Sequence, residues 1–219
     1  MSIYFFEGDR MTPKVSEEYK KKRKQELVEV AREVFVQKGF IRTTMQDIMD
    51  RAGISRGALY SYFNNIEHVF LEVLKYDDQK DIQNFMPSGE GSNWLQIRQW
   101  IEEQRTYIER IEQTLLLAKA EFFLSSNYAN DKEHFPYISE RYIRLIEVIE
   151  NVINVGENRG EFNPQQPSHT IARYIISFLN GLMLDTFQFG YEQTKVKEQL
   201  SILLFTLEKL LNPTSLNEE

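Results

Sequence analysis

The sequence predicts an all-α protein, and three observations support this fold class. Apolar residues recur at the i, i+3, i+4, i+7 spacing of helices in most segments. No segment alternates apolar and polar residues as a half-buried strand does, and no internal repeat is present. Glycine, proline and asparagine separate the helical segments. We predict about nine helices, arranged as an N-terminal three-helix helix-turn-helix domain and a larger C-terminal helical domain.

The stretch 43–65 predicts two short helices joined by a glycine turn. The first helix is indicated by apolar residues on one face, at Met45, Ile48, Met49 and Ala52. Gly53 ends it, because glycine tolerates the left-handed conformation found just past a helix. Ser55 can cap the second helix, in which Leu59 and Phe63 lie one turn apart and face inward. This arrangement is typical of a helix-turn-helix.

The outward side of the second helix has the chemistry of DNA contact. Arg56 lies in its first turn and can bridge the O6 and N7 acceptors of guanine. Gly57 and Ala58 are small enough to let the backbone approach a groove floor. Phosphate oxygens could accept bonds from the hydroxyls of Tyr60, Ser61 and Tyr62. The alternative is an ordinary helical hairpin surface, but the whole pattern favours nucleic-acid binding.

Composition bounds the remaining possibilities. The 219 residues are enough for one or two domains, and the 42% apolar share is ample for a core. Without cysteine there are neither disulfides nor thiolate metal sites, which fits a reducing compartment. We find no uninterrupted apolar run of about 20 residues and no secretion signal, so no membrane contact is expected. Residues 1–14 are predicted to be a disordered lead.

The acidic net charge of −7 is unevenly distributed. Residues 1–65 carry 12 basic and 9 acidic side chains, whereas the remainder carries 14 and 24, so the local balances are +3 and −10. Phosphate binding depends on local charge. The distribution therefore indicates a modestly basic DNA head, residues 15–72, on an acidic body, residues 73–212, with a tail at 213–219.

The head also contains a basic run and several helix caps. The run Lys20–Lys24 opens the first helix, where its lysines, including Lys22 and Lys24, either face solvent or contact phosphate. Thr43 and Gln46 have the spacing of a capping box for the next helix, with Thr44 as the competing cap. A hydroxyl there could also bond a DNA phosphate. Asn65 can cap a helix to about Phe85, followed by a linker at 86–92.

The body is predicted to be helical throughout. We expect helices at about 94–110, then to about 126, a loop at 127–131, and helices at about 135–160, 168–189 and 194–211. The last two helices are apolar on more than one face, so they could form half of an intermolecular four-helix bundle. Candidate interface residues are Ile175, Phe178, Leu182, Leu203 and Leu207. The alternative is that they form the core of one subunit.

A set of residues between about Leu27 and Leu74 forms a motif more specific than a generic helix-turn-helix. It comprises Ala31, Phe35, Gly39-Phe40, Thr43-Thr44, Asp47-Ile48, Ala52-Gly53, the run 55–60 and Tyr62-Phe63. On these residues the chain resembles the TetR family of transcriptional regulators. The downstream helices are similar to the family in number, length and order, including the turn at 160–162 and the helix containing Asn180-Gly181-Leu182.

The resemblance implies a homodimeric repressor in the bacterial cytoplasm that binds a palindromic double-stranded DNA operator. A small-molecule effector bound by the C-terminal domain would tilt the helix after Asn65 and release the heads. By position in the motif, the DNA contacts would be Thr44, Ser55, Arg56, Gly57, Ala58, Tyr60 and Tyr62. The chain departs from the family at Ile66, often lysine, and at His68, often glutamate. The first departure would remove a phosphate contact, and the second would weaken a helix cap. Operator affinity would then depend more on the Lys20–Lys24 run.

Aromatic residues of the body could line a cavity for a lipophilic effector. They are Trp100, Tyr107, Phe122, Phe123 and Tyr142, with Tyr128 and Phe135 also possible, although a residue of this kind is more often plain core. The inference rests on fold rather than on a motif.

Two other function classes compete. For an enzyme the sequence offers no phosphate loop, nucleophile elbow or marked carboxylate pair, and His68, His134 and His169 are not in a metal-ligand spacing. No catalytic residue, metal or cofactor is therefore predicted. A helical scaffold would explain the acidic body but not the residues from Arg56 to Tyr62. Binding of a short palindrome in a gel shift separates the three.

Overall fold

The computed structural model describes residues 17–85, 91–130 and 132–214. The predicted lead at 1–14, most of the predicted linker and the last five residues of the predicted tail lie outside these ranges. The described residues contain no strand, so the predicted all-α class is confirmed. Four helices build the head and its connection to the body: α1 (Glu17–Lys38), α2 (Met45–Ala52), α3 (Arg56–Tyr60) and α4 (Ile66–Phe85).

The rest of the described chain forms the helical body. Its long helices are α5 (Asn93–Glu109), α8 (Pro136–Asn158), α9 (Ser168–Phe189) and α11 (Val196–Leu211). Its shorter elements are η1 (Ile111–Gln113), α6 (Leu116–Phe123), α7 (Ser126–Asn130), η2 (Lys132–His134) and α10 (Tyr191–Thr194). The described ranges thus hold eleven α-helical segments rather than about nine, because α7 and α10 are short helices that the periodicity does not indicate.

One predicted helix and one predicted loop differ from the structure. The segment predicted to run unbroken to about residue 126 is interrupted between η1 and α6. Thr114 causes the break, since its hydroxyl donates to Ile111 O (2.7 Å) and accepts from Leu116 N (3.3 Å), a local alternative to helical bonding. The predicted loop at 127–131 mostly forms α7, where Ser125 Oγ accepts a bond from Tyr128 N (3.2 Å).

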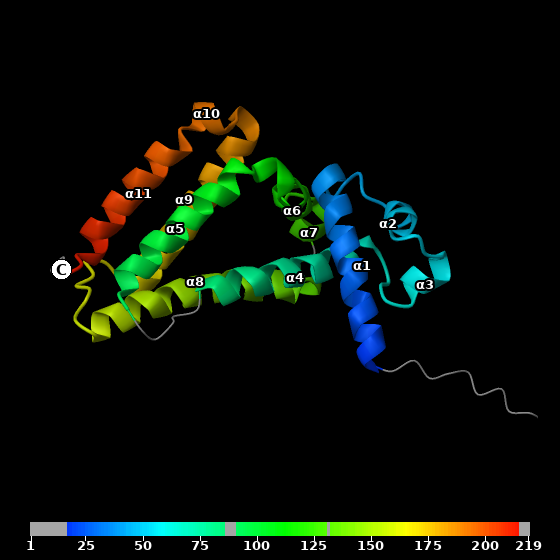
Figure 1. Cartoon of the computed structure of the whole chain (residues 1–219), viewed down its shortest axis with the longest axis horizontal. Helices are drawn as coiled ribbons and strands as arrows, with labels where there is room; N and C mark the ends of the chain where they lie inside the picture. The colour runs from blue at the N-terminus through cyan, green and yellow to red at the C-terminus, as the bar shows by residue number, and fades with distance from the viewer. Residues whose placement is uncertain (1–16, 86–90, 131, 215–219) are drawn as a thin grey trace, which may run out of the picture.

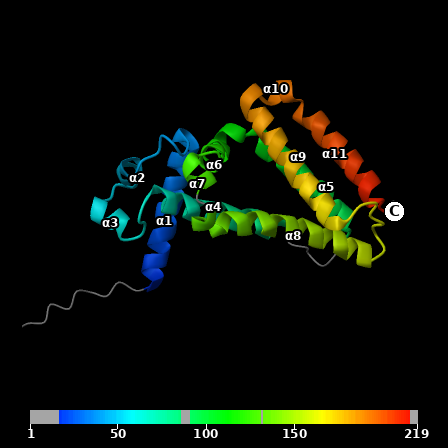
Figure 2. The same ribbon diagram turned by 180° about the vertical axis from the view of Figure 1, so that it is seen from behind.

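The helices are arranged with the head at one end and the C-terminal helices at the other. Figure 1 shows α2 and α3 farthest from the C-terminus, and the reverse view in Figure 2 shows the same order. Helices α4 and α8 lie side by side along one edge, while α5, α9 and α11 pack together at the far end. Helix α4 is continuous across the domain boundary predicted at residues 72 and 73, so one rigid element belongs to both parts.

Two clusters of buried apolar residues hold these parts together. The first contains the head core, and it also includes Phe122 of α6 and Ile138 of α8. Rings from head and body meet in it, with centroids 4.9 Å apart for Phe40 and Phe122 and 5.0 Å for Phe70 and Phe122. Pairs at such distances add about 0.5–1.5 kcal/mol beyond area burial. The second cluster joins α5, α8, α9 and α11. The head is therefore packed onto the body rather than tethered to it.

The turn at 160–162 anchors the start of α5. Oxygens of the Glu161 carboxylate accept bonds from the backbone N–H groups of Asn93 and Trp94 (both 2.9 Å) and from the Ser92 hydroxyl. Burial alone would raise the pKa of Glu161, but the bonds from Ser92, Trp94 and Asn93 lower it below its ordinary value. The carboxylate thus satisfies N–H groups that a helix start leaves without partners.

Candidate nucleic-acid interface

Helix α2 begins with a capping box at Thr44 and Asp47, and the prediction of Thr43 with Gln46 is wrong. Thr44 Oγ1 accepts from Asp47 N (3.2 Å), while Asp47 Oδ2 accepts from Thr44 N (2.9 Å). Thr43 is buried, and its hydroxyl donates back to Gly39 O (2.5 Å) in the α1–α2 turn. The side chain of Gln46 instead donates to Asp50 (2.6 Å). The competing cap named from the sequence, Thr44, is the actual one.

Asp47 also ties α2 to the end of α1. Its Oδ1 accepts a bond from Lys38 Nζ at 2.6 Å. This bond, followed by those from the Thr44 backbone and hydroxyl, lowers the pKa of Asp47 to about 2. The start of α2 is thereby held against the end of α1 by charge-assisted bonds.

The turn forms as predicted, and the second helix starts where predicted but ends at Tyr60, so Phe63 lies three residues past α3 rather than within it. Gly53 adopts a left-handed conformation (φ 63°) and its N–H bonds to Met49 O. Ser55 Oγ accepts from Ala58 N (3.3 Å), which caps α3. Leu59 and Phe63 are both fully buried, at 0% exposure. The inward side of α3 is therefore fixed, and so is its outward side.

The outward side of α3 presents the predicted DNA-contact residues. Arg56, Gly57, Ala58, Tyr60 and Ser61 are all exposed. The Arg56 guanidinium lies 5.2 Å from the centroid of the Tyr60 ring, so the two form a cation–π pair on the surface. The Ser61 hydroxyl donates to Ala58 O (2.7 Å), which leaves its oxygen available only as an acceptor in this arrangement.

Other predicted contacts are less accessible. Tyr62 is half-buried and packs against the head core. Thr44 and Ser55 are exposed, and their hydroxyls serve as helix caps. The two lysines of the basic run differ in position: Lys22 is exposed, whereas the Lys24 ammonium is ion-paired with Glu72 and lies 5.9 Å from the Phe63 ring centroid. Lys24 therefore serves the packing of α1 on α4, which argues against the predicted phosphate contact.

The start of α4 is capped by Asn65, as the sequence predicts, and His68 makes a further bond there. Asn65 Oδ1 accepts from His68 N (2.8 Å), as expected for a cap. His68 Nδ1 in turn accepts from Asn64 N (3.2 Å), one residue before the cap, whereas the glutamate of a capping box accepts from the N–H of the cap residue itself. The expected weakening of the capping box at His68 therefore stays a prediction. Ile66 packs against the head core, so its apolar side chain has a structural role.

The aromatic residues predicted to line an effector cavity do not lie together. Phe122 and Phe123 belong to the cluster shared by head and body, with Tyr128 and Phe135. Trp100 and Tyr142 pack against the second cluster, which joins α5, α8, α9 and α11. Tyr107 is half-buried near the end of α5. These side chains are therefore divided between two cores and do not line one cavity.

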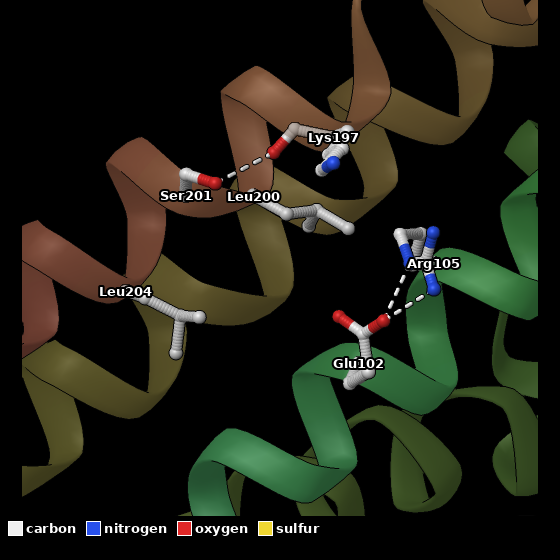
Figure 3. Close-up of a pocket in the computed structure, with 6 residues that line it drawn as sticks. All are labelled: Glu102, Arg105, Lys197, Leu200, Ser201 and Leu204. Carbon is white, nitrogen blue, oxygen red and sulfur yellow. Dashed lines mark hydrogen bonds and ion pairs between the residues drawn. The ribbon is translucent and has the colours of Figure 1, made fainter.

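A groove of about 260 Å³ lies between α5 and α11. Figure 3 shows Glu102 and Arg105 on α5 facing Lys197, Leu200, Ser201 and Leu204 on α11. The Arg105 guanidinium is held by Glu102 (2.6 Å), and Ser201 Oγ donates to Lys197 O (2.9 Å). The two leucines form an apolar floor beside these charged groups. None of the predicted cavity residues lines this groove.

Four of the five predicted interface residues are buried inside the subunit. Ile175, Leu182, Leu203 and Leu207 are at most 3% exposed and belong to the body core, while Phe178 is half-buried against it. The buried four cannot present a surface to a partner. Exposed apolar side chains lie on other faces of the same helices, at Tyr174, Leu184, Phe187, Ile202 and Phe205.

Sequence reasoning missed three acidic residues that join head and body. Asp77 and Asp78 are buried on α4, and Glu121 of α6 accepts a bond from Ile41 N (2.9 Å) in the α1–α2 turn. Gly39 in that turn has φ 75°, and a Cβ there would lie 2.5 Å from the Glu121 carboxylate. A signal for Asp77 exists in the sequence, because it continues the apolar stripe of α4 at a core position.

The described residues contain neither a membrane-spanning helix nor a metal-binding cluster. No helix among them has the length and apolar character needed to cross a bilayer. No group of three or more histidine, aspartate or glutamate side chains in the described ranges is placed to hold a metal ion.

A capped, rigid pair of short helices that turns small and cationic side chains outward defines a helix-turn-helix DNA-binding protein. Residues 27–73 match the description "Bacterial regulatory proteins, tetR family", and residues 96–197 match "Tetracyclin repressor-like, C-terminal domain". The chain belongs to the TetR family of bacterial transcriptional regulators. Members of this family typically respond to ligands and work as dimers.

Individual relatives support the same family. The HTH-type transcriptional regulator YfiR of Bacillus subtilis is 30% identical over 187 residues, which cover 85% of this chain and 90% of that protein. The transcriptional repressor KstR2 of Mycobacterium tuberculosis is 27% identical over 166 residues, covering 70% and 76%. The fold resembles a TetR-family regulator from Pectobacterium atrosepticum with a TM-score of 0.69 at 18% identity, covering 91% of this chain and all of that one.

Proposed function

We propose that this protein is a homodimeric repressor in the bacterial cytoplasm. Two α3 helices bind successive major grooves of a palindromic operator, and a mostly apolar small molecule releases them. The single observation that carries the DNA-binding proposal is the exposed surface of α3, held in place by Leu59 and Phe63 beneath it. The name of the relative KstR2 supports repression rather than activation.

The exposed faces of α9 and α11 support the dimer. Tyr174, Phe187, Ile202 and Phe205 are large apolar side chains that are 38–62% exposed in the single chain. Apolar surface of this kind is typical of protein interfaces. Pairing α9 and α11 with their copies would give a four-helix bundle at the end opposite the heads. The bundle then sets the distance between the two α3 helices, which must be about 34–36 Å for successive grooves.

The effector is proposed to act where head and body share a core. Phe122 and Phe123 of α6 and Phe135 at the start of α8 pack in the buried cluster that also contains the phenylalanine rings of the head. A lipophilic molecule that separates these rings would change how the head sits on the body. Such a ligand can lower operator affinity by no more than the ratio of its affinities for the two head–body arrangements, which is typically a factor of about 5–150.

The test is operator binding by fluorescence anisotropy, using a fragment selected from the DNA upstream of the protein's own gene. Arg56→Ala and Tyr60→Ala each remove an exposed α3 side chain that belongs to neither buried core, and each also removes the cation–π pair between the two. We expect each to abolish specific binding while the oligomeric state stays the same. Arg98→Ala is the matched control, because Arg98 is an exposed arginine on α5, outside the head.

Wild-type binding by both α3 variants would overturn the assignment of α3 as the recognition helix. Failure of the wild type to select any DNA fragment would instead favour the helical scaffold. Effector release is tested in the same assay with a panel of apolar molecules, each compared with a charged analogue of equal size. If only charged compounds released the operator, the lipophilic class would be wrong.

A further inference from the structure

Two adjacent carboxylates are buried on α4, the helix that runs from the head into the body. Asp77 is 8% exposed and Asp78 is 3% exposed. Charged side chains are rarely this buried unless they are paired, because removing a charge from water is costly. The partners of both residues lie on α1, α6 and α8 rather than on α3, so the proposed DNA contacts do not explain them.

Asp77 connects α4 to the head and to the body at once. Its Oδ1 accepts a bond from Arg32 Nε of α1 at 2.6 Å, and its Oδ2 lies 4.0 Å from Lys119 Nζ of α6. The Arg32 side chain is itself only 31% exposed. Asp77 thus joins the long helix of the head to the body helix that also contacts the α1–α2 turn.

Asp78 connects the same helix to α8. Its carboxylate accepts bonds from the Tyr137 hydroxyl (2.7 Å) and from Arg141 Nε (2.6 Å). Burial, and then the bond to Asp78, raise the pKa of Tyr137, so this phenol remains a neutral donor at physiological pH. Both donors come from the first turns of α8, which lies beside α4.

The geometry of a helix makes these two contacts interdependent. Consecutive side chains point about 100° apart around the axis, so α4 presents Asp77 to α1 and α6 and Asp78 to α8. Rotating α4 to improve one set of bonds would break the other. Buried ion pairs often contribute little net stability, but losing one partner leaves an uncompensated charge.

We propose that Asp77 and Asp78 are positioning residues for operator binding, which fix the rotation of α4 between α1 and α8 and therefore the angle of the head on the body. The proposal rests on the proposed function, because a defined angle matters only where two heads must match a spacing on DNA. The residues touch no DNA themselves and act through α1 and α3.

The test measures the head–body distance directly by pulsed electron paramagnetic resonance. The chain has no cysteine, so Gln37→Cys on α1 and Glu147→Cys on α8 give two labels at exposed positions without background. Labelled protein is diluted with unlabelled protein so that only pairs within one chain are counted. The variants are Asp77→Asn and Asp78→Asn, which remove the charge at nearly constant shape.

The matched control is Glu72→Gln. Glu72 also lies on α4 and also pairs with α1, through Lys24, but its other bond is to Lys75 of the same helix. We expect a narrow distance distribution for the wild type and the control. Asp77→Asn and Asp78→Asn should broaden or shift it, and should weaken operator binding about 5–150-fold, the usual range of coupling between sites.

Tyr137→Phe is a milder variant that removes one donor to Asp78 and keeps every charge, should either asparagine variant fail to fold. It should broaden the distribution in the same direction and to a smaller extent. Unchanged distances in all three variants, with only a lower melting temperature, would overturn the proposal and leave the pair a stability element. This outcome does not depend on DNA, so it is distinct from failure of the wild type to bind any operator.

Discussion

The head and the far end of the body use apolar residues in different ways. In α3 a single side chain, Leu59, is buried, and every other residue of the helix is exposed. In α11 two apolar seams run along one helix. One seam, which includes Leu203 and Leu207, is fully buried, and the other, which includes Ile202 and Phe205, is more than 60% exposed.

This difference explains which predictions from the sequence were correct. A helix with one apolar side has only one way to face its core, so its outward side follows directly. A helix with two apolar seams can bury either one in its own subunit, and periodicity does not distinguish them. The seam at Leu200, Leu203, Leu207 and Leu211 is buried because α5 and α9 pack on that side. Two of the predicted interface residues, Leu203 and Leu207, lie on this buried seam.

The largest expected effect tests the inner and outer sides of α3 against each other. Leu59→Ala should lower the free energy of unfolding by about 2–5 kcal/mol, because a fully buried leucine leaves a cavity. The variant Ala58→Leu changes the exposed neighbour of Leu59, so it should alter stability by no more than about 0.5 kcal/mol. It should nevertheless weaken operator binding, because the larger side chain keeps the backbone of α3 away from the DNA groove. Chemical denaturation and anisotropy measure the two effects, and equal destabilisation by both variants would contradict the orientation of α3.

The next effect compares the two seams of α11. Phe205→Glu should convert the dimer to a monomer with little loss of subunit stability, because Phe205 is 62% exposed in the single chain. Leu207→Ala should lower subunit stability by about 2–5 kcal/mol while the surviving folded protein stays dimeric. Sedimentation velocity and thermal unfolding separate the cases. A dimer that survives Phe205→Glu would place the interface elsewhere.

A smaller effect concerns the pH dependence of the α1–α2 junction. The pKa of Asp47 is lowered from 3.8 to about 2, so the stabilisation is fully present above pH 3.8 and is lost as the pH falls through about 2. Asp47→Asn should therefore be less stable than the wild type by a constant amount from pH 7 to about pH 5. The difference should shrink between pH 4 and 2. A difference that grew on acidification would show that the ion pair with Lys38 is not its source.

The smallest expected effect separates two lysines of the basic run. Lys22→Ala should reduce the slope of log affinity against log salt by about 1, as expected for loss of one phosphate contact. Lys24→Ala should leave that slope unchanged and lower stability slightly, because Lys24 pairs with Glu72. Operator titrations at several salt concentrations give both slopes. A flattened slope for Lys24→Ala alone would reverse the roles that the structure assigns.

Much of the helix-turn-helix stretch, residues 43–65, could be predicted from the sequence. Gly53, Ser55, Asn65 and the burial of Leu59 were all anticipated, since each depends on bonds or packing within one or two helical turns. The error nearby is of the same local kind: Thr43 and Thr44 compete for one cap, and Thr44 forms it while Thr43 donates to Gly39 O. For His68, the family pattern did not reveal that its imidazole accepts a bond from Asn64 N, one residue before the cap.

The candidate effector residues could not be predicted in this way. Phe122 and Trp100 are both aromatic residues on the apolar stripes of helices. Phe122 nevertheless packs in the cluster shared with the head, and Trp100 packs against the second cluster, which joins α5, α8, α9 and α11. Nothing in the spacing of residues along one helix reveals which neighbour covers it. The break at Thr114, which turns α6 toward the head, decides this division.

The sequence by itself determined the long helices, the caps at Ser55 and Asn65 and the outward face of α3, because helix bonding and capping join groups within about four residues. The tertiary structure alone decided the partners of buried charges, such as Arg32 with Asp77, 45 residues apart, and Arg141 with Asp78, 63 residues apart. It also decided which seam of α11 faces the subunit core. These choices depend on how whole helices pack, and packing is set by the joint shape of several helices rather than by the pattern along any one of them.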